Sequence, residues 1–232
     1  MGADAPPWLG PIAALVAGYL IGSIPFAYII VKLVMGEDVT QHGTGNIGSM
    51  NVRRTTGSWG WFVVAMLCDG FKGMIPVAVV KLLSGLALVA PYGVSLGGSP
   101  MTGSLAVPAM LLGCVLGHNY SLYMILIEKR AFRTGKGLAT GGGAVFAYDW
   151  RYFLIVIVVA LTVIALTRYM MAGQVAAAFA LPVTALALRS PDWPFALLLG
   201  LLVYAAHHKR FMGLLRGEEP KSYISDRMGP RG

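Results

Sequence analysis

The chain has 232 residues, of which 56% are hydrophobic and 12% are charged. Soluble domains carry about 25% charged residues, and disordered chains combine low hydrophobicity with high charge, so both classes are excluded. The formal net charge of +8 reflects 18 Lys and Arg against 10 Asp and Glu; in the polytopic membrane protein that remains, this excess points to membrane orientation and anionic lipid headgroups, not to nucleic acid.

Seven apolar stretches are candidates to cross the hydrocarbon core of a bilayer, which is about 30 Å thick. They cover approximately residues 9–34, 61–80, 105–127, 137–148, 152–167, 169–188 and 193–206. The first includes Gly-Ser-Ile-Pro-Phe at residues 22–26 within its helix. The fourth stretch is short and rich in glycine, so it is either a span of its own or the first half of one long helix with the fifth.

The distribution of Lys and Arg decides between these topologies. With seven spans and the N-terminus outside, 14 basic residues are cytoplasmic and three, Lys81, Arg151 and Arg189, are outside. If the fourth and fifth stretches form one span, eight basic residues lie on each side of the membrane. Because cytoplasmic loops carry the excess of basic residues, the sequence predicts an all-α, seven-helix transmembrane bundle with a cytoplasmic C-terminus. No repeat or linker is visible, so residues 1–232 are expected to form one integral membrane domain.

The first region too polar for lipid follows the first span and contains Gly-Thr-Gly-Asn-Ile-Gly at residues 43–48. No strand precedes it, so a dinucleotide-binding fold is disfavoured. Glycine turns let backbone N–H groups approach an anion, and Asn46 and Asn51 add side-chain donors. Arg53 or Arg54 adds a guanidinium that suits phosphate. The alternative is a flexible, solvated loop whose arginines only set the topology.

The second region places Asp69 and Lys72 inside an otherwise apolar helix. Their i,i+3 spacing puts both on one helix face, where they can form an ion pair. Ionisable residues within a membrane span indicate function by default. The alternative is a self-satisfied pair that locks two helices together.

The third region, Phe-Arg-Thr-Gly-Lys-Gly at residues 132–137, opens a helix. Helix N-termini attract anions; Gly135 and Gly137 leave the backbone accessible, while Arg133 and Lys136 supply positive charge. It is not a Walker A loop, because glycine follows Lys136 where Ser or Thr would bind magnesium. A phosphate site without an obligatory metal is therefore predicted; a basic topology signal is the alternative.

Histidines and cysteines add less information. His118 is expected near the cytoplasmic end of the third span and His207 at that end of the seventh. A lone histidine more often packs than catalyses, but the gathering of His42, His118, His207 and His208 towards one membrane face, near two phosphate-type loops, favours chemistry modestly. Cys68 and Cys114 lie in apolar runs, which indicates neither a disulfide framework nor a metal site.

These regions, in this order, resemble the PlsY-type glycerol-3-phosphate acyltransferases of bacteria. The matching residues are those at 22–26, at 43–48 with Asn51, Val52 and Arg54, at 69–73 with Pro76, at 117–118 and at 135–140. The resemblance extends from about residue 22 to residue 217. It implies a multi-pass protein of the bacterial inner membrane with seven helices and a cytoplasmic active site.

The resemblance implies transfer of a fatty acyl group from acyl phosphate to the sn-1 hydroxyl of glycerol 3-phosphate, which yields lysophosphatidic acid. Arg54 and the Gly135-Lys136-Gly137 loop would bind the glycerol phosphate. Thr44 stands where the family usually has a functional serine hydroxyl, and His207 matches a histidine at the end of the last helix. The expected partners are the two substrates and membrane lipids, with the protein acting as a monomer and without metal or organic cofactor.

Acyl phosphate is already activated, so proximity and orientation can supply much of the catalysis. No Ser-His-Asp arrangement is evident, and direct attack by the substrate hydroxyl, without an acyl-enzyme, is expected. His118, His207 or a substrate phosphate oxygen could take the proton, and the sequence does not choose among them.

Several positions depart from the family pattern. Met50 replaces a threonine, Ser121 a proline, Thr134 a glycine and Met171 a serine, while Lys209 and Arg210 stand near His207 where the family has glutamate and asparagine. These departures leave a second interpretation open, in which the protein is a diverged paralogue that is non-catalytic or takes an altered substrate. A transporter of small phosphate esters or anions is a further alternative, although its site should lie near mid-membrane.

Overall fold

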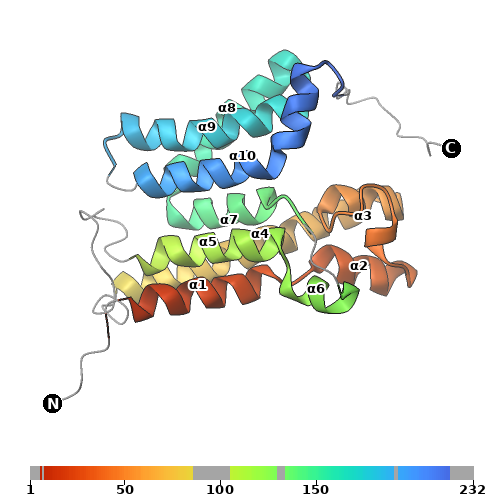
Figure 1. Ribbon diagram of the computed structural model, residues 1–232, viewed down its shortest axis with the longest axis horizontal. Helices are drawn as coiled ribbons and strands as arrows, with labels where there is room; N and C mark the ends of the chain where they lie inside the picture. The colour runs from red at the N-terminus through yellow and green to blue at the C-terminus, as the bar shows by residue number, and fades with distance from the viewer. Residues whose placement is uncertain (1–5, 7, 86–104, 130–133, 191–192, 220–232) are drawn as a thin grey trace. The chain divides into compact units, whose positions relative to one another are not determined.

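The computed structural model describes residues 6, 8–85, 105–129, 134–190 and 193–219 (Figure 1). These described residues form ten α-helices and one short 3-10 helix, and they contain no strand. They divide into two compact units, Met1–Trp150 (unit 1) and Arg151–Gly232 (unit 2). The predicted all-α fold is confirmed.

The described residues of unit 1 contain seven α-helices and one short 3-10 helix. Its elements are α1 (Leu9–Gly22), α2 (Phe26–Met35), η1 (Val39–Gln41), α3 (Ser49–Thr56), α4 (Trp59–Gly85), α5 (Ala106–Asn119), α6 (Leu122–Glu128) and α7 (Leu138–Tyr148). Unit 2 contains α8 (Trp150–Thr167), which begins at the boundary, α9 (Met170–Ala187) and α10 (Trp193–Leu215).

Five helical segments among the described residues are long and apolar enough to cross a membrane. They are Leu9–Met35, Trp59–Ser84, Ala106–Glu128, Trp150–Thr167 and Met170–Ala187. The predicted fourth span corresponds to α7, which has 11 residues and is therefore about 16 Å long. It is a helix separate from α8, because the backbone becomes extended at Asp149. The count of seven spans and the orientation stay predictions.

The first predicted span is broken, contrary to the expectation of one continuous helix through residues 22–26. The helix α1 ends at Gly22 and α2 begins after Pro25, because proline lacks an N–H and disfavours helical backbone in the residue before it. The third predicted span breaks similarly, with α5 ending at Asn119 and α6 starting at Leu122. Each break frees main-chain carbonyls inside unit 1.

Glycine brings the backbones of α1 and α5 into direct contact. A Cβ at Gly18 or Gly22 would overlap the carbonyl oxygens of Met110 and Cys114, respectively. Gly113 and Gly117 do the same from α5 against α1. Both pairs have the four-residue spacing of small-residue membrane interfaces, and the paired residue numbers rise together, so the two helices run parallel.

The helices α4 and α7 also run parallel and in close contact. Gly73 faces the carbonyl of Thr140, and Gly143 faces that of Gly70. At the far end, Lys81 Nζ donates to the carbonyls of Ala147 (3.1 Å) and Tyr148 (2.8 Å). This ammonium caps the C-terminus of α7, where positive charge is favourable.

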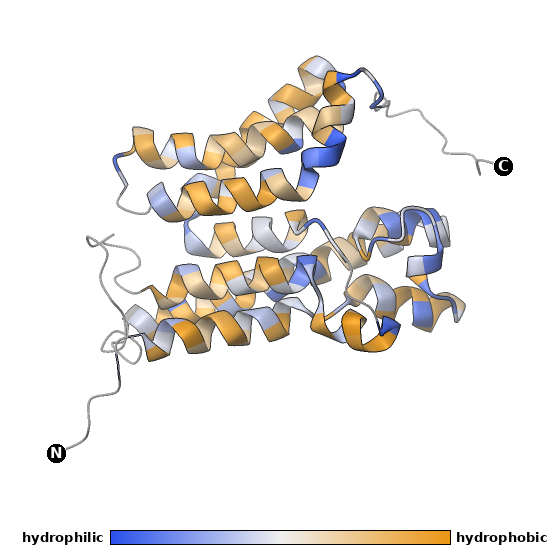
Figure 2. Ribbon diagram, viewed as in Figure 1, coloured by the Kyte–Doolittle hydropathy of each residue, from blue (hydrophilic) through white to orange (hydrophobic). Residues whose placement is uncertain are grey.

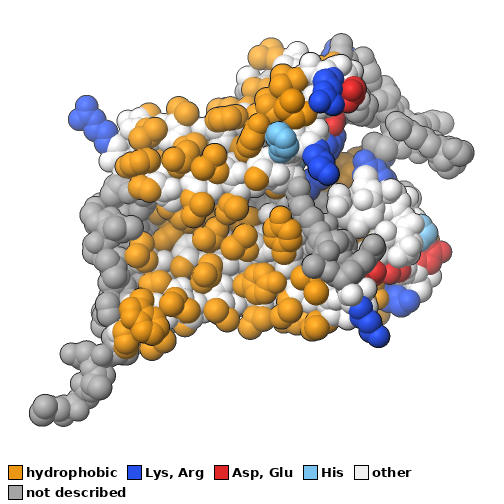
Figure 3. Space-filling model, viewed as in Figure 1, with side chains coloured by type: hydrophobic (Ala, Val, Ile, Leu, Met, Phe, Trp, Pro, Cys, Tyr) orange, Lys and Arg blue, Asp and Glu red, His pale blue; other side chains and the backbone are white. Residues whose placement is uncertain are grey.

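Polar and apolar residues are separated along unit 1. Residues of α3 and its flanking loops are hydrophilic at the end where α2 and α6 also lie (Figure 2). Many hydrophobic side chains lie on the face shown in Figure 3, and those of α1 include the exposed Val16 and Leu20. An apolar exterior of this kind suits contact with lipid.

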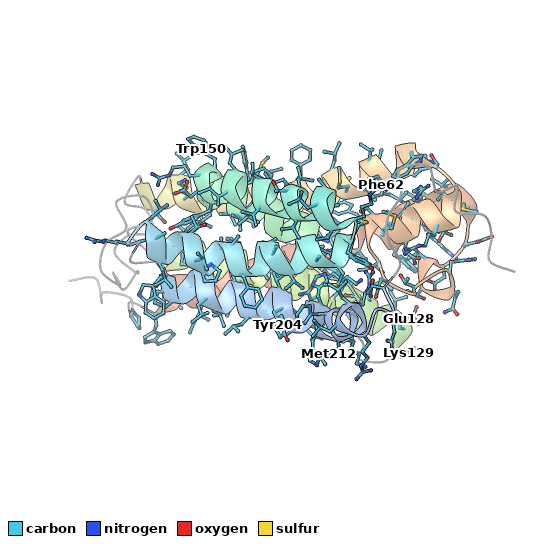
Figure 4. All side chains as sticks on the ribbon, turned by 90° about the horizontal axis from the view of Figure 1, so that it is seen from above. Phe62, Glu128, Lys129, Trp150, Tyr204 and Met212 are labelled. Atoms are coloured by element: carbon cyan, nitrogen blue, oxygen red, sulfur yellow. The ribbon has the colours of Figure 1, made fainter. Side chains whose placement is uncertain are left out.

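Unit 2 is a three-helix packing of α8, α9 and α10. Gly200 of α10 lies against the carbonyl of Ala178 on α9. An aromatic cluster joins the same helices, with ring centroids 6.1 Å apart for Phe179 and Tyr204 and 5.6 Å apart for Tyr204 and Phe211. Tyr204 and Met212 mark the course of α10 in Figure 4.

Candidate substrate-binding site

Asn51 organises the glycine loop that precedes it. Its Nδ2 donates to the carbonyls of Val39 (2.9 Å) and His42 (3.0 Å), and its Oδ1 accepts from the N–H of Thr44 (3.1 Å). The side chain is buried. The amide predicted to contact phosphate is thus used to shape the loop, while Thr44 itself is exposed and Asn46 is half-buried.

The Arg54 side chain lies beside the glycine turn, and its phosphate-binding role stays a prediction. A Cβ at Gly43 would overlap Asn51 Oδ1 and would lie 3.3 Å from Arg54 Cδ. Gly43 also has a φ of +56°, and Gly45 has a φ of +68°, a region that disfavours side chains. Glycine therefore allows the turn to form and the exposed Arg54 to pack over it.

The glycine-lysine loop rests on the end of α5. The N–H of Thr134 donates to the carbonyl of Asn119 at 2.9 Å. A Cβ at Gly135 would overlap the His118 imidazole, and one at Gly137 would lie 3.0 Å from Asn119 Oδ1. Lys136, between these two glycines, is half-buried.

The helix α7 begins directly after this loop. Gly137 is its N-cap residue, with a φ of +70° and no capping side chain. The first N–H groups of a helix have no intrahelical acceptor, and with the helix dipole they favour an anion. The loop therefore presents glycine backbone, a lysine and a helix N-terminus in one place.

The two glycine loops are joined directly. The N–H of Ile47, in the first loop, donates to the carbonyl of Thr134 at 2.8 Å. The structure thereby brings together two regions that lie about 90 residues apart in the sequence. The bond holds the glycine-lysine loop, which contains Lys136, to the loop that leads into α3, the helix that carries Arg54.

Asp69 and Lys72 form the predicted ion pair, and it is buried. Lys72 Nζ lies 2.8 Å from Asp69 Oδ1, and both side chains are 2% exposed. Lys72 Nζ also donates to the carbonyl of Ile24 at 2.7 Å, which the break between α1 and α2 leaves available. The pair therefore ties α4 to that break, in keeping with its predicted supporting role.

His118 is fixed beside the ion pair. Its Nδ1 lies 3.2 Å from Thr140 Oγ1 and 3.6 Å from Asp69 Oδ1. The ring is buried and packs against Gly135. This geometry makes His118 part of the wall that supports the glycine-lysine loop; its catalytic role stays a prediction.

His207 lies in unit 2, on α10. Its Nδ1 is 2.8 Å from the carbonyl of Val203. Because a carbonyl only accepts, Nδ1 carries the proton in the neutral ring, and Nε2 is the acceptor nitrogen. Nearby, Arg210 binds both carboxylate oxygens of Glu219, at 2.9 and 2.5 Å.

Sequence reasoning missed the serines at the two helix breaks. Ser121 Oγ donates to the carbonyl of Ser23 at 2.5 Å, and Ser23 Oγ accepts from the N–H of Leu122 at 3.2 Å. A serine before an apolar run is an N-cap signal that could have located the start of α6.

Arg133, predicted to bind phosphate, lies outside the described residues. Among described residues, no cluster of His, Cys, Asp or Glu could hold a metal ion.

A family model described as glycerol-3-phosphate acyltransferase matches residues 12–217. The glycerol-3-phosphate acyltransferase of Thermus thermophilus is 37% identical over 207 residues, which are 88% of this chain and 92% of the relative. That of Synechococcus sp. is 36% identical over 218 residues, with coverages of 93% and 95%.

A solved structure gives the same result. The crystal structure of PlsY (YgiH), an integral membrane glycerol 3-phosphate acyltransferase, in its glycerol 3-phosphate form is similar with a TM-score of 0.73 and 26% identity. The similarity covers 92% of this chain and 96% of that one. The resemblance seen in the sequence is confirmed, and the chain belongs to the glycerol-3-phosphate acyltransferase family.

Proposed function

We propose that this protein transfers a fatty acyl group from acyl phosphate to the sn-1 hydroxyl of glycerol 3-phosphate and so forms lysophosphatidic acid. The observation that carries the proposal is the junction of the two glycine loops through Ile47 and Thr134. It holds the loop of Lys136 to the loop that precedes α3, the helix of Arg54, so that the two cations can recognise one phosphate ester. The family to which the chain belongs supports the same substrate.

Glycerol 3-phosphate would bind through its phosphate to Lys136, the N–H groups of Gly135 and Gly137, and the start of α7. Arg54 would contact phosphate from α3, and the exposed Thr44 and half-buried Asn46 would add polar groups from the glycine loop. Asn51 would act through the shape it imposes on that loop. Arg133 would add positive charge before the glycine-lysine loop.

The reaction would be a direct acyl transfer. The substrate hydroxyl oxygen forms a bond to the acyl carbon, the bond from that carbon to phosphate breaks, and inorganic phosphate leaves. The hydroxyl proton passes to His207, His118 or a phosphate oxygen. The tautomer of His207 makes its Nε2 a chemically suitable acceptor, and the activated donor makes a metal or organic cofactor unnecessary.

We further infer one functional membrane domain of seven spans, with the N-terminus outside and the C-terminus in the cytoplasm, in the inner membrane of a bacterium. The separation of α7 from α8 and the placement of basic residues support the seven spans. The family match runs across both units, which supports a single domain. The protein would act as a monomer.

The decisive experiment incubates purified protein with palmitoyl phosphate and radiolabelled glycerol 3-phosphate. Lysophosphatidic acid should form, with the acyl group on the sn-1 oxygen, and acyl-CoA or acyl carrier protein should not replace acyl phosphate. Lys136→Ala should raise the KM for glycerol 3-phosphate by about 10- to 100-fold, the value of a hydrogen bond to a charged group.

The matched control is Lys32→Ala, which removes an exposed lysine that donates to the carbonyl of Gly36. This variant should keep the wild-type KM. No product with any acyl donor would contradict the enzyme assignment, and uptake of labelled glycerol 3-phosphate into vesicles would then favour the transporter. An unchanged KM in Lys136→Ala would contradict the role given to that lysine.

A further inference from the structure

Thr134 uses every polar group that it has, although its side chain is fully buried. Its N–H donates to the carbonyl of Asn119 (2.9 Å), and its own carbonyl accepts from the N–H of Ile47 (2.8 Å). Its Oγ1 donates to the carbonyl of His118 (2.9 Å) and accepts from the N–H of Ser121 (3.1 Å). Four bonds thus join the glycine-lysine loop, the first loop and the end of α5 at one residue.

The hydroxyl is the side-chain part of this junction. It satisfies one carbonyl and one N–H at the point where α5 ends and α6 has not yet begun. Leaving buried main-chain groups without partners is unfavourable. Without the hydroxyl, the chain around Ser121 and Thr134 would have to move apart to reach other partners.

We propose that Thr134 is a positioning residue, whose hydroxyl sets the register of the glycine-lysine loop against α5 and the first loop, so that Lys136 and Arg54 reach one phosphate. This inference rests on the function proposed above. Thr134 does not contact substrate in this proposal; it acts through Lys136, two residues further on, and through the Ile47 bond.

The test uses two variants of opposite design. Thr134→Val keeps the branched shape and removes the hydroxyl, whereas Thr134→Ser keeps the hydroxyl. Because a shifted loop would weaken the hydrogen bond from Lys136 to the charged phosphate, Thr134→Val should raise the KM for glycerol 3-phosphate by about 10- to 100-fold. The KM for acyl phosphate and kcat should change much less, and Thr134→Ser should remain near wild type.

Thr184→Val is the matched control, because it removes a buried hydroxyl from α9 in unit 2. It should leave the KM for glycerol 3-phosphate unchanged. A rise in KM in both valine variants, or a Thr134→Val variant with wild-type KM, overturns the positioning role. So does a Thr134→Ser variant as impaired as Thr134→Val.

A double-mutant cycle with Ser121 tests the partner directly. Ser121 has a φ of −63°, which proline adopts, and proline has no N–H to be satisfied. Thr134→Val should therefore destabilise the protein less in the Ser121→Pro background than in wild type. Strictly additive effects on unfolding would contradict the bond between the two residues.

Hydrogen exchange separates this inference from the enzyme assignment. The amides of Ser121 and Ile47 should exchange faster in Thr134→Val than in wild type or Thr134→Ser. If wild-type protein makes no lysophosphatidic acid, the proposed function fails, and the exchange experiment still tests the junction. Unchanged exchange in Thr134→Val overturns the junction whatever the activity.

Discussion

Asp69 and Lys72 show how much a single residue decides in the interior of unit 1. Two opposite charges lie 2.8 Å apart with 2% of each side chain exposed. Burying charges is unfavourable unless they are paired and hydrogen-bonded. The ammonium meets this condition through Asp69 and the carbonyl of Ile24, so the pair depends on the helix break as well as on its own spacing.

Asp69→Asn should destabilise the protein by about 3–5 kcal/mol, because it leaves the Lys72 ammonium buried without its counter-charge. The double variant Asp69→Asn with Lys72→Met should recover part of this loss, since both charges are then absent. Equilibrium unfolding in mixed micelles measures the two changes. Wild-type stability in Asp69→Asn would show that the pair is not needed for the fold.

Two residues that looked like separate departures from the family pattern prove to be partners. Ser121 has an N–H because it is not proline, and Thr134 has a hydroxyl because it is not glycine; the first donates to the second. The sequence shows each departure on its own. Their pairing was not predictable, because the residues are 13 positions apart and only the folding of the connection brings them together.

Close helix contact is the main feature at the scale of the elements. The helices α1 and α5 touch through glycines, so an added methyl group would meet main-chain atoms that cannot rotate away. The four-residue spacing of Gly18 and Gly22, and of Gly113 and Gly117, is visible in the sequence. The sequence does not show which residues of the partner helix each glycine pair faces, because that depends on the rotation of each helix about its axis.

Gly113→Ala should destabilise the protein by about 1–3 kcal/mol through overpacking, because its Cβ would lie 2.8 Å from the N atom of Tyr19. Gly60→Ala is the control: its Cβ would meet only Ser58 Oγ, at 3.5 Å. Alanine also has the higher helix propensity, so this control should gain up to about 1 kcal/mol. Thermal unfolding in detergent should therefore move in opposite directions; equal shifts would contradict the packing argument.

The helix breaks are the clearest difference between the predicted and observed elements. Hydropathy predicts continuous spans at residues 9–34 and 105–127, whereas both are interrupted, and Ser121 Oγ of one break bonds to Ser23 O of the other. Hydropathy averages over a window and does not register the loss of one turn of helix. The break before α2 could have been predicted from Pro25; the one before α6 follows from tertiary contacts as well as from its serine cap.

The topology is the property of the whole molecule that most needs measurement, and α7 decides it. If α7 crosses the membrane by itself, the α7–α8 junction lies outside. If α7 and α8 together form one crossing, each loop after α8 lies on the opposite side of the membrane from its place in the seven-span topology. At the junction, Trp150 is exposed. Near the end of α6, Glu128 and Lys129 lie side by side (Figure 4), in the segment assigned to the cytoplasm.

With Cys68 and Cys114 replaced by alanine, a cysteine in place of Trp150 should react with a membrane-impermeant maleimide added to intact cells. A cysteine in place of Lys129 should react only after the cells are opened. Labelling is read by the mass shift of the purified protein. Protection of the cysteine at position 150 in intact cells would contradict the seven-span topology.

Composition and the local order of residues were sufficient to establish the class of the protein, its helical membrane character, the three polar regions and the family. Three contacts are visible only in the folded protein: the loop at residues 43–48 bonds to Thr134, Lys72 binds the carbonyl of Ile24, and His118 packs against Gly135. Each of these contacts joins residues far apart in the chain. They depend on which helix faces pack together, and local pattern does not encode that choice.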